Sequence, residues 1–221
     1  MRRLIAFAVF ALAACQSPDP SVQTGAPETA EPETAEPVAQ APTPGALAPA
    51  FALPATDGTE HRLADYRGRT VVLEWLNYDC PYVGKHYGGG AMQALQRDAA
   101  ADSVVWLAIV SSAPGEQGHF APDEMDARTA SEGGRQSAVL LDPSGAVGRA
   151  YGAKTTPHLF VIDPAGRVVY NGAIDDRPTS DPADLDGATP YVRLALAAVA
   201  EGRAADPATT PPYGCSVKYG V

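Results

Sequence analysis

Apolar runs rich in branched residues alternate with helix-compatible stretches from residue 70 to residue 201, and this alternation restricts the fold most strongly. The runs with the length and composition of strands are 70–76, 104–110, 138–141, 159–162 and 167–170. Helices are expected at 81–99, 121–134, 143–151 and 188–201. The turn residues Asp163-Pro164-Ala165-Gly166 join the last two runs into a hairpin. This order predicts an α/β domain whose central mixed sheet is flanked by helices.

The N-terminus has the form of an export signal. Arg2 and Arg3 precede an apolar stretch at residues 4–14, which is too short for a bilayer span of roughly 20 residues. The run Leu12-Ala13-Ala14-Cys15 resembles the lipobox of bacterial lipoproteins, and this resemblance implies that Cys15 is lipidated. By analogy with Gram-negative lipoproteins, Gln16 favours the outer membrane, with the domain facing the periplasm. The alternative is an ordinary cleaved signal that contains a cysteine.

The segment after the signal is rich in Pro, Ala, Glu and Thr and has no aromatic residue between Gln16 and Leu47. Such a segment cannot bury enough apolar surface to offset the entropy of ordering it. We therefore expect a signal peptide at 1–14, a disordered linker at 15–49 and one domain at 50–221. The formal net charge of -10 disfavours nucleic acid or anionic lipid as a partner.

Cys80 is the first candidate for chemistry, because it stands between an expected strand and an expected helix. Pro81 suits the first turn of a helix, which places Cys80 at or beside the N-cap. Unpaired N–H groups and the positive end of the helix dipole favour the thiolate there. The sequence therefore predicts a redox nucleophile. The alternative is an inert, buried cysteine in the core.

Thr156-Pro157 is a second candidate, at the start of the run that continues through residue 162. A proline at the start of a strand lies at an edge or in a special conformation. A cis bond between Thr156 and Pro157 would expose the Thr156 backbone beside the reactive cysteine. Alone the pair is a weak signal, since most X-Pro bonds are trans.

Together these motifs resemble the thioredoxin-like superfamily, and within it the peroxiredoxin-like redoxin branch. The resemblance covers residues from about 50 to 219. The matching stretches are 77–83, 141–152, 156–163, 172–176 and 214–219. It implies a thioredoxin-like fold with Cys80 at a strand-to-helix turn and a cis Pro157 beside it. The residues that it implies around the nucleophile are Asn77, Pro81, Thr156 and Pro157.

The chain also departs from the motifs of these families. Thioredoxins use Cys-x-x-Cys, but Asn77 precedes Cys80 by three residues and Val83 follows it by three. Peroxiredoxins carry Pro-x-x-x-Thr-x-x-Cys, and here Leu73 and Asn77 stand at the Pro and Thr positions. Copper-delivery relatives use Cys-x-x-x-Cys, where this chain has Gly84. Fast peroxide chemistry of the usual kind is therefore not expected.

Cys215 is the natural partner for Cys80, because neither of the local positions holds a cysteine. A flexible tail with several prolines would deliver it, and the alternative is that the two cysteines never meet. The leading hypothesis is an envelope thiol–disulfide oxidoreductase, with Cys80 as nucleophile and Cys215 as distant resolving cysteine. One alternative is a thiol-dependent peroxidase, and another is a non-enzymatic binding module with a structural Cys80–Cys215 disulfide.

The expected partners follow from this chemistry. They are protein thiols or disulfides, or a thioredoxin-like electron donor, with peroxide as the substrate of the first alternative. No cofactor is expected, because this chemistry needs only an external electron donor or acceptor. No metal is expected, since His61, His119 and His158 show no metal-ligand spacing with each other or with Cys80. Lys85 and His86 do not share the helical face of Cys80, so solvated surface positions are expected for them.

Overall fold

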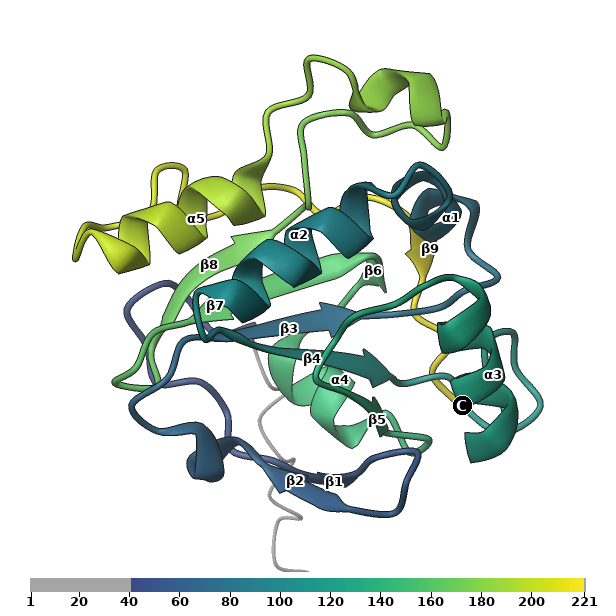
Figure 1. Cartoon of the computed structure of the whole chain (residues 1–221). Helices are drawn as coiled ribbons and strands as arrows, with labels where there is room; N and C mark the ends of the chain where they lie inside the picture. The colour runs from purple at the N-terminus through teal and green to yellow at the C-terminus, as the bar shows by residue number, and fades with distance from the viewer. Residues whose placement is uncertain (1–40, 221) are drawn as a thin grey trace, which may run out of the picture. The chain divides into compact units, whose positions relative to one another are not determined.

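The structure, a computed structural model, describes residues 41–220. Its centre is a mixed sheet in the order β5-β4-β3-β7-β8 (Figure 1). The strands are β3 (Val71–Trp75), β4 (Val105–Val110), β5 (Ala138–Leu141), β7 (His158–Ile162) and β8 (Val168–Gly172). β4 runs parallel to β3 and β5 runs parallel to β4, whereas β7 is antiparallel to β3 and forms a hairpin with β8. The predicted thioredoxin-like α/β fold with a mixed sheet is confirmed.

The helices lie close to their predicted ranges. They are α1 (Pro81–Gly88), α2 (Ala91–Ala101), α3 (Pro122–Ser131), α4 (Ala146–Tyr151) and α5 (Tyr191–Ala200). The expected helix over 81–99 is divided in two by Gly88-Gly89-Gly90, because Gly90 adopts a left-handed conformation with φ of 76°. This division leaves α1 as a short helix that begins directly after Cys80.

The two faces of β3 bury different sets of side chains, because successive residues of a strand point to opposite faces. Val72 and Leu76 pack with side chains of α1, α2 and α5. Leu73 and Trp75 pack on the other face with Tyr151 of α4. Helices α2 and α5 accordingly lie on one face of the sheet in Figure 1 and α4 lies on the other. The sheet is thus covered on both faces.

Short elements complete the fold. The strands are β1 (Ala52–Pro54), β2 (Glu60–Arg62), β6 (Thr155–Thr156) and β9 (Cys215–Ser216), and the 3-10 helices are η1 (Leu63–Tyr66) and η2 (Pro182–Leu185). β1 and β2 form one two-stranded sheet, while β6 and β9 form another. The second pair attaches the C-terminal tail to the Thr156-Pro157 segment.

Part of the segment assigned to the linker is attached to the domain. Leu47 forms a bridge with Arg167, and the Ala48 N–H donates to the Gly166 carbonyl at 3.0 Å. The structured region therefore begins before residue 50. The signal peptide and Cys15 lie outside the described residues, and within 41–220 no helix is long and apolar enough to cross a membrane.

Candidate active site

Cys80 is the N-cap of α1, directly after the loop that leaves β3. Pro81 occupies the first helical turn, as the sequence predicts, and the N–H groups of Val83 and Gly84 donate to the Cys80 carbonyl at 2.9 Å. The side chain is only 1% exposed. The helix therefore begins at the sulfur-bearing residue, which is enclosed by other parts of the chain.

Asn77 shapes the loop before Cys80. Its side-chain oxygen accepts a hydrogen bond from the Asp79 N–H at 2.9 Å, and its amide donates to the Gln117 carbonyl at 3.4 Å. A Cβ placed on Gly118 would lie 2.5 Å from the Asn77 side chain, so only a glycine fits there. The position that carries a cysteine in Cys-x-x-Cys proteins is thus filled here by a turn-forming amide.

Thr156 and Pro157 lie beside the sulfur. The Thr156–Pro157 bond is cis, as the resemblance implies. The Cys80 thiol donates to the Thr156 carbonyl at 2.9 Å. The Thr156 hydroxyl is buried and has no hydrogen-bond partner among residues 41–220 in this thiol state. It is therefore available to donate once the sulfur is charged.

Cys215 comes to the same place through strand pairing. β9 pairs antiparallel with β6 in a register that sets Cys215 opposite Thr156. Gly214 makes this close approach feasible, because a Cβ there would lie 2.1 Å from the Thr156 carbonyl oxygen, and its φ is +139°. Both cysteines are free thiols in the structure.

The electrostatics of the two thiols differ. Burial raises the pKa of Cys80, but the hydrogen bonds that its thiolate would accept from the Cys215 and Thr156 side chains and from the N–H groups of Cys215 and Val83 outweigh it. The resulting pKa of Cys80 lies below its usual value. Burial, together with the hydrogen bond to Cys80 and its charge, raises the pKa of Cys215 to about 11. Of the two thiols, Cys80 therefore loses its proton more readily.

The C-terminal tail is fixed along its length, which corrects the expectation of a flexible arm. The Val217 N–H donates to the Lys154 carbonyl at 3.1 Å, and the Tyr219 hydroxyl donates to the Ala153 carbonyl at 2.8 Å. The Lys218 carbonyl accepts a hydrogen bond from the Ala113 N–H at 2.8 Å. The prolines upstream of Cys215 did not indicate that the tail is ordered, because the groups that hydrogen-bond to the tail belong to loops that are distant in the sequence.

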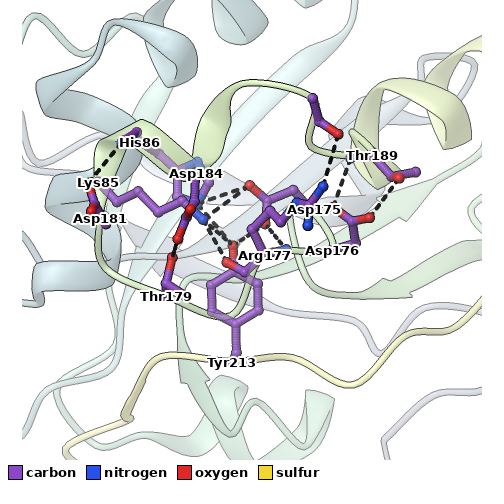
Figure 2. A network of polar contacts seen from close by, with 12 residues as sticks. Lys85, His86, Asp175, Asp176, Arg177, Thr179, Asp181, Asp184, Thr189 and Tyr213 are labelled. Atoms are coloured by element: carbon purple, nitrogen blue, oxygen red, sulfur yellow. Dashed lines mark hydrogen bonds and ion pairs between the residues drawn. The ribbon is translucent and has the colours of Figure 1, made fainter.

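Lys85 and His86 are buried at 1% and 2% exposure, so the expectation of solvated surface positions is wrong. They point toward Asp175 and Tyr213, as Figure 2 shows. Lys85 forms an ion pair with Asp175 at 3.4 Å, and the charges of the two groups compensate each other. The helical spacing of Lys85 and His86 relative to Cys80 is as expected; what the sequence did not reveal is that the tail covers the other side of α1.

No group of three or more His, Cys, Asp or Glu side chains that could hold a metal ion occurs within residues 41–220. Trp75 and Trp106 are core residues, at 0% and 1% exposure. The site residues that sequence analysis missed are Tyr213 and Gly214. The only sequence signal for Gly214 is a glycine placed directly before the second cysteine.

The chain resembles several solved structures. A crystal structure of an uncharacterized conserved protein from Geobacillus kaustophilus is 28% identical, with a TM-score of 0.69 over 80% of this chain and 92% of that one. A hypothetical protein from Sinorhizobium meliloti is also 28% identical, with a TM-score of 0.66 over 82% of this chain and 97% of that one. No functionally curated protein matches the sequence.

The family of the chain is assigned by a family model rather than by these two structures. The model of the Redoxin family matches residues 43–188, which include β3, α1 and the Thr156-Pro157 segment. The match ends before β9, so it covers the Cys80 side of the site and does not include the tail. With its thioredoxin-like fold and its thiol-based redox chemistry, the chain belongs to the Redoxin family.

Proposed function

We propose that the protein is a thiol–disulfide oxidoreductase in which Cys80 is the nucleophile and Cys215 resolves the mixed disulfide. The observation that carries this proposal is the register of β6 and β9, which sets Cys215 opposite Thr156. The Cys80 thiol donates a hydrogen bond to the carbonyl of the same Thr156. The lowered pKa of Cys80 and the raised pKa of Cys215 support the order of the two roles.

The exchange balances without a further reagent. The Cys80 thiolate attacks one sulfur of a client disulfide, forms a mixed disulfide and releases the first client thiolate, which takes up a proton. Cys215 then loses its proton and attacks the Cys80 sulfur, so the Cys80–Cys215 bridge forms and the second client thiolate leaves. The client gains two electrons and two protons, and the two cysteines lose them. An external dithiol returns the protein to its reduced state.

The test uses the full chain with Cys15→Ser, so that the only thiols are those of Cys80 and Cys215. Reduced protein is mixed with a disulfide-bonded peptide, and the products are followed by mass spectrometry. The intact pair is expected to release two peptide thiols and to form the bridge, whereas Cys215→Ala is expected to stop at a mixed disulfide on Cys80. Exchange by Cys80→Ser at the rate of the intact pair would refute the proposal.

A parallel reaction with hydrogen peroxide distinguishes the peroxidase alternative. The Asn77 side chain is already bonded to the Asp79 N–H and to the Gln117 carbonyl, so it is not free to bind peroxide as the threonine of peroxiredoxins does. We therefore expect Cys80 to react with peroxide no faster than a free cysteine. A much faster reaction that ends in the Cys80–Cys215 bridge would instead assign a peroxidase.

We also infer an envelope location, with a lipid on Cys15 that anchors the domain. This inference is supported by the arginines, the apolar stretch and the small residues that precede Cys15. Cys15→Ser is expected to move the protein from the membrane fraction to the soluble fraction of cells that express it. Unchanged membrane association of that variant would exclude the lipid as the anchor.

A further inference from the structure

A buried polar cluster lies where the C-terminal tail crosses α1, and the exchange chemistry does not use it. Its members are Lys85 and His86 of α1, Asp175 after β8, and Tyr213 of the tail (Figure 2). The Lys85 side chain is 0% exposed and that of Asp175 is 5% exposed. Ionised groups are seldom buried this far unless each is paired. The buried charges of the cluster therefore need polar partners, and the tail supplies one of them.

Tyr213 is the only contribution of the tail to this set of four. Its hydroxyl donates to the Asp175 carboxylate, and its oxygen lies 3.4 Å from Lys85 Nζ and 3.2 Å from His86 Nε2. Lys85 Nζ also donates to the Arg177 carbonyl at 2.6 Å and lies 5.4 Å from the centre of the Tyr213 ring. Removing the tail would take the Tyr213 hydroxyl away from both the Asp175 carboxylate and the Lys85 ammonium.

His86 is a neutral member of the cluster. Burial lowers its pKa to about 4, although the charge of Asp175 acts in the opposite direction. A neutral imidazole with its proton on Nε2 donates to the Tyr213 oxygen, which leaves the hydroxyl proton for Asp175. The hydrogen bonds of Tyr213 are thus consistent with one positive and one negative charge in the cluster.

The chain is short between this anchor and the second cysteine. Gly214 is the single residue between Tyr213 and Cys215, and it lies against the Thr156 carbonyl. The other side of the cluster is connected to the nucleophile, because Lys85 and His86 belong to the helix that Cys80 caps. Both cysteines are therefore connected to the same set of contacts.

We propose that Tyr213 is a positioning residue: its hydroxyl, held by Asp175, Lys85 and His86, fixes the tail so that Cys215 lies against Cys80. This inference rests on the proposed function, since positioning matters only if the two sulfurs react. It assigns the cluster a role in setting how readily the Cys80–Cys215 bridge forms. It also makes the docked tail the cover that keeps the Cys80 sulfur from solvent.

The experiment compares Tyr213→Phe with Tyr219→Phe in the full chain with Cys15→Ser. Each substitution removes one tail hydroxyl and keeps the ring, but Tyr219 donates to the Ala153 carbonyl, outside the cluster. Two quantities are measured: the equilibrium constant of the Cys80–Cys215 bridge in glutathione buffers, and the alkylation rate of reduced Cys80. Thermal unfolding of both variants shows whether each remains folded.

Tyr213→Phe is expected to lower the equilibrium constant of the bridge about tenfold and to speed Cys80 alkylation about tenfold, the effect of one lost hydrogen bond to a charged group. Tyr219→Phe is expected to change either quantity by no more than about threefold, because its hydrogen bond is to a neutral carbonyl and lies outside the cluster. Equal effects of the two variants would overturn the positioning role. If the unsubstituted pair forms no bridge, the proposed function fails, and Cys80 alkylation still decides whether Tyr213 holds the tail.

Discussion

At the scale of single residues, the approach of the two cysteines depends on a missing side chain. Gly214 lies so near the Thr156 carbonyl that a Cβ would be 2.1 Å from its oxygen. The backbone there also has a positive φ of 139°, which L side chains rarely adopt. Cys215 therefore reaches the site because the residue before it has no side chain.

Gly214→Ala is expected to detach β9 from β6 and to destabilise the fold by about 1–3 kcal/mol, as for a strained backbone position. Gly202→Ala is the matched control, because Gly202 also has a positive φ, of 65°, but no atom lies within 4 Å of its added Cβ. Urea unfolding and Cys80 alkylation are measured for both. Cys80 alkylation is expected to be faster in Gly214→Ala but not in Gly202→Ala. An unchanged alkylation rate in Gly214→Ala would show that β9 tolerates the added methyl group.

At the scale of elements, β3 carries an acid into the core. Glu74 is 0% exposed and accepts hydrogen bonds from Trp106 Nε1 at 2.7 Å, Tyr87 at 3.2 Å and Gln96 at 3.3 Å. Burial raises the pKa of Glu74 to about 7, and the three hydrogen bonds limit the rise. The strand therefore links the protonation of one side chain to the packing of α1 and α2 against the sheet.

This linkage has a definite sign. The pKa of Glu74 is higher in the folded chain than its ordinary value of 4.5, so the folded state binds the proton more tightly. The stability that follows is complete below about pH 4.5 and is lost as the pH rises through about 7. Its full size is at most about 3 kcal/mol.

Glu74→Gln is expected to remove this part of the pH dependence. Urea unfolding at about pH 5 and about pH 8 gives the change in free energy of unfolding for both proteins, and the fall between the two should be smaller in the variant. The variant is expected to be less stable than the unsubstituted protein at both pH values, because the N–H groups of its amide would face the three groups that donate to Glu74. An identical fall in both proteins would show that Glu74 does not titrate in this range.

At the scale of the whole molecule, a Cys80–Cys215 bridge would join two residues that are far apart in the sequence. The chain-entropy argument assigns roughly 4–5 kcal/mol to closing a loop of more than about 100 residues. The two residues already belong to one site, and the tail is already docked, so we expect little of this gain to be lost to rearrangement. Oxidation should therefore stabilise the entire domain.

Thermal unfolding of the oxidised and the reduced protein measures this effect. The oxidised form is expected to unfold at a higher temperature, whereas Cys215→Ser should unfold at the same temperature under reducing and oxidising conditions. A bridge that left the unfolding temperature unchanged would mean that it distorts the folded state by as much as it restricts the unfolded one.

The sequence predicted the sheet and its helices because hydrophobic periodicity and turn residues are local signals. The position of Cys80 was predictable for the same reason, since a strand, a proline and a helix follow one another along the chain. The burial of Lys85 and His86 was not, because it depends on Asp175 and Tyr213, which are distant in sequence. The docking of the tail was missed likewise, since β9 is only two residues long and its partner β6 is equally short.

The pairing of β9 with β6 bears on how long a client would stay attached. A thiol held beside the reacting sulfur acts at a far higher effective concentration than a thiol in solution. Under the proposed exchange, a mixed disulfide on Cys80 would be cleaved soon after it forms, before the client has time to try other pairings of its own cysteines. Such a dwell time suits a protein that transfers electrons once per encounter, rather than one that shuffles incorrect disulfides into correct ones.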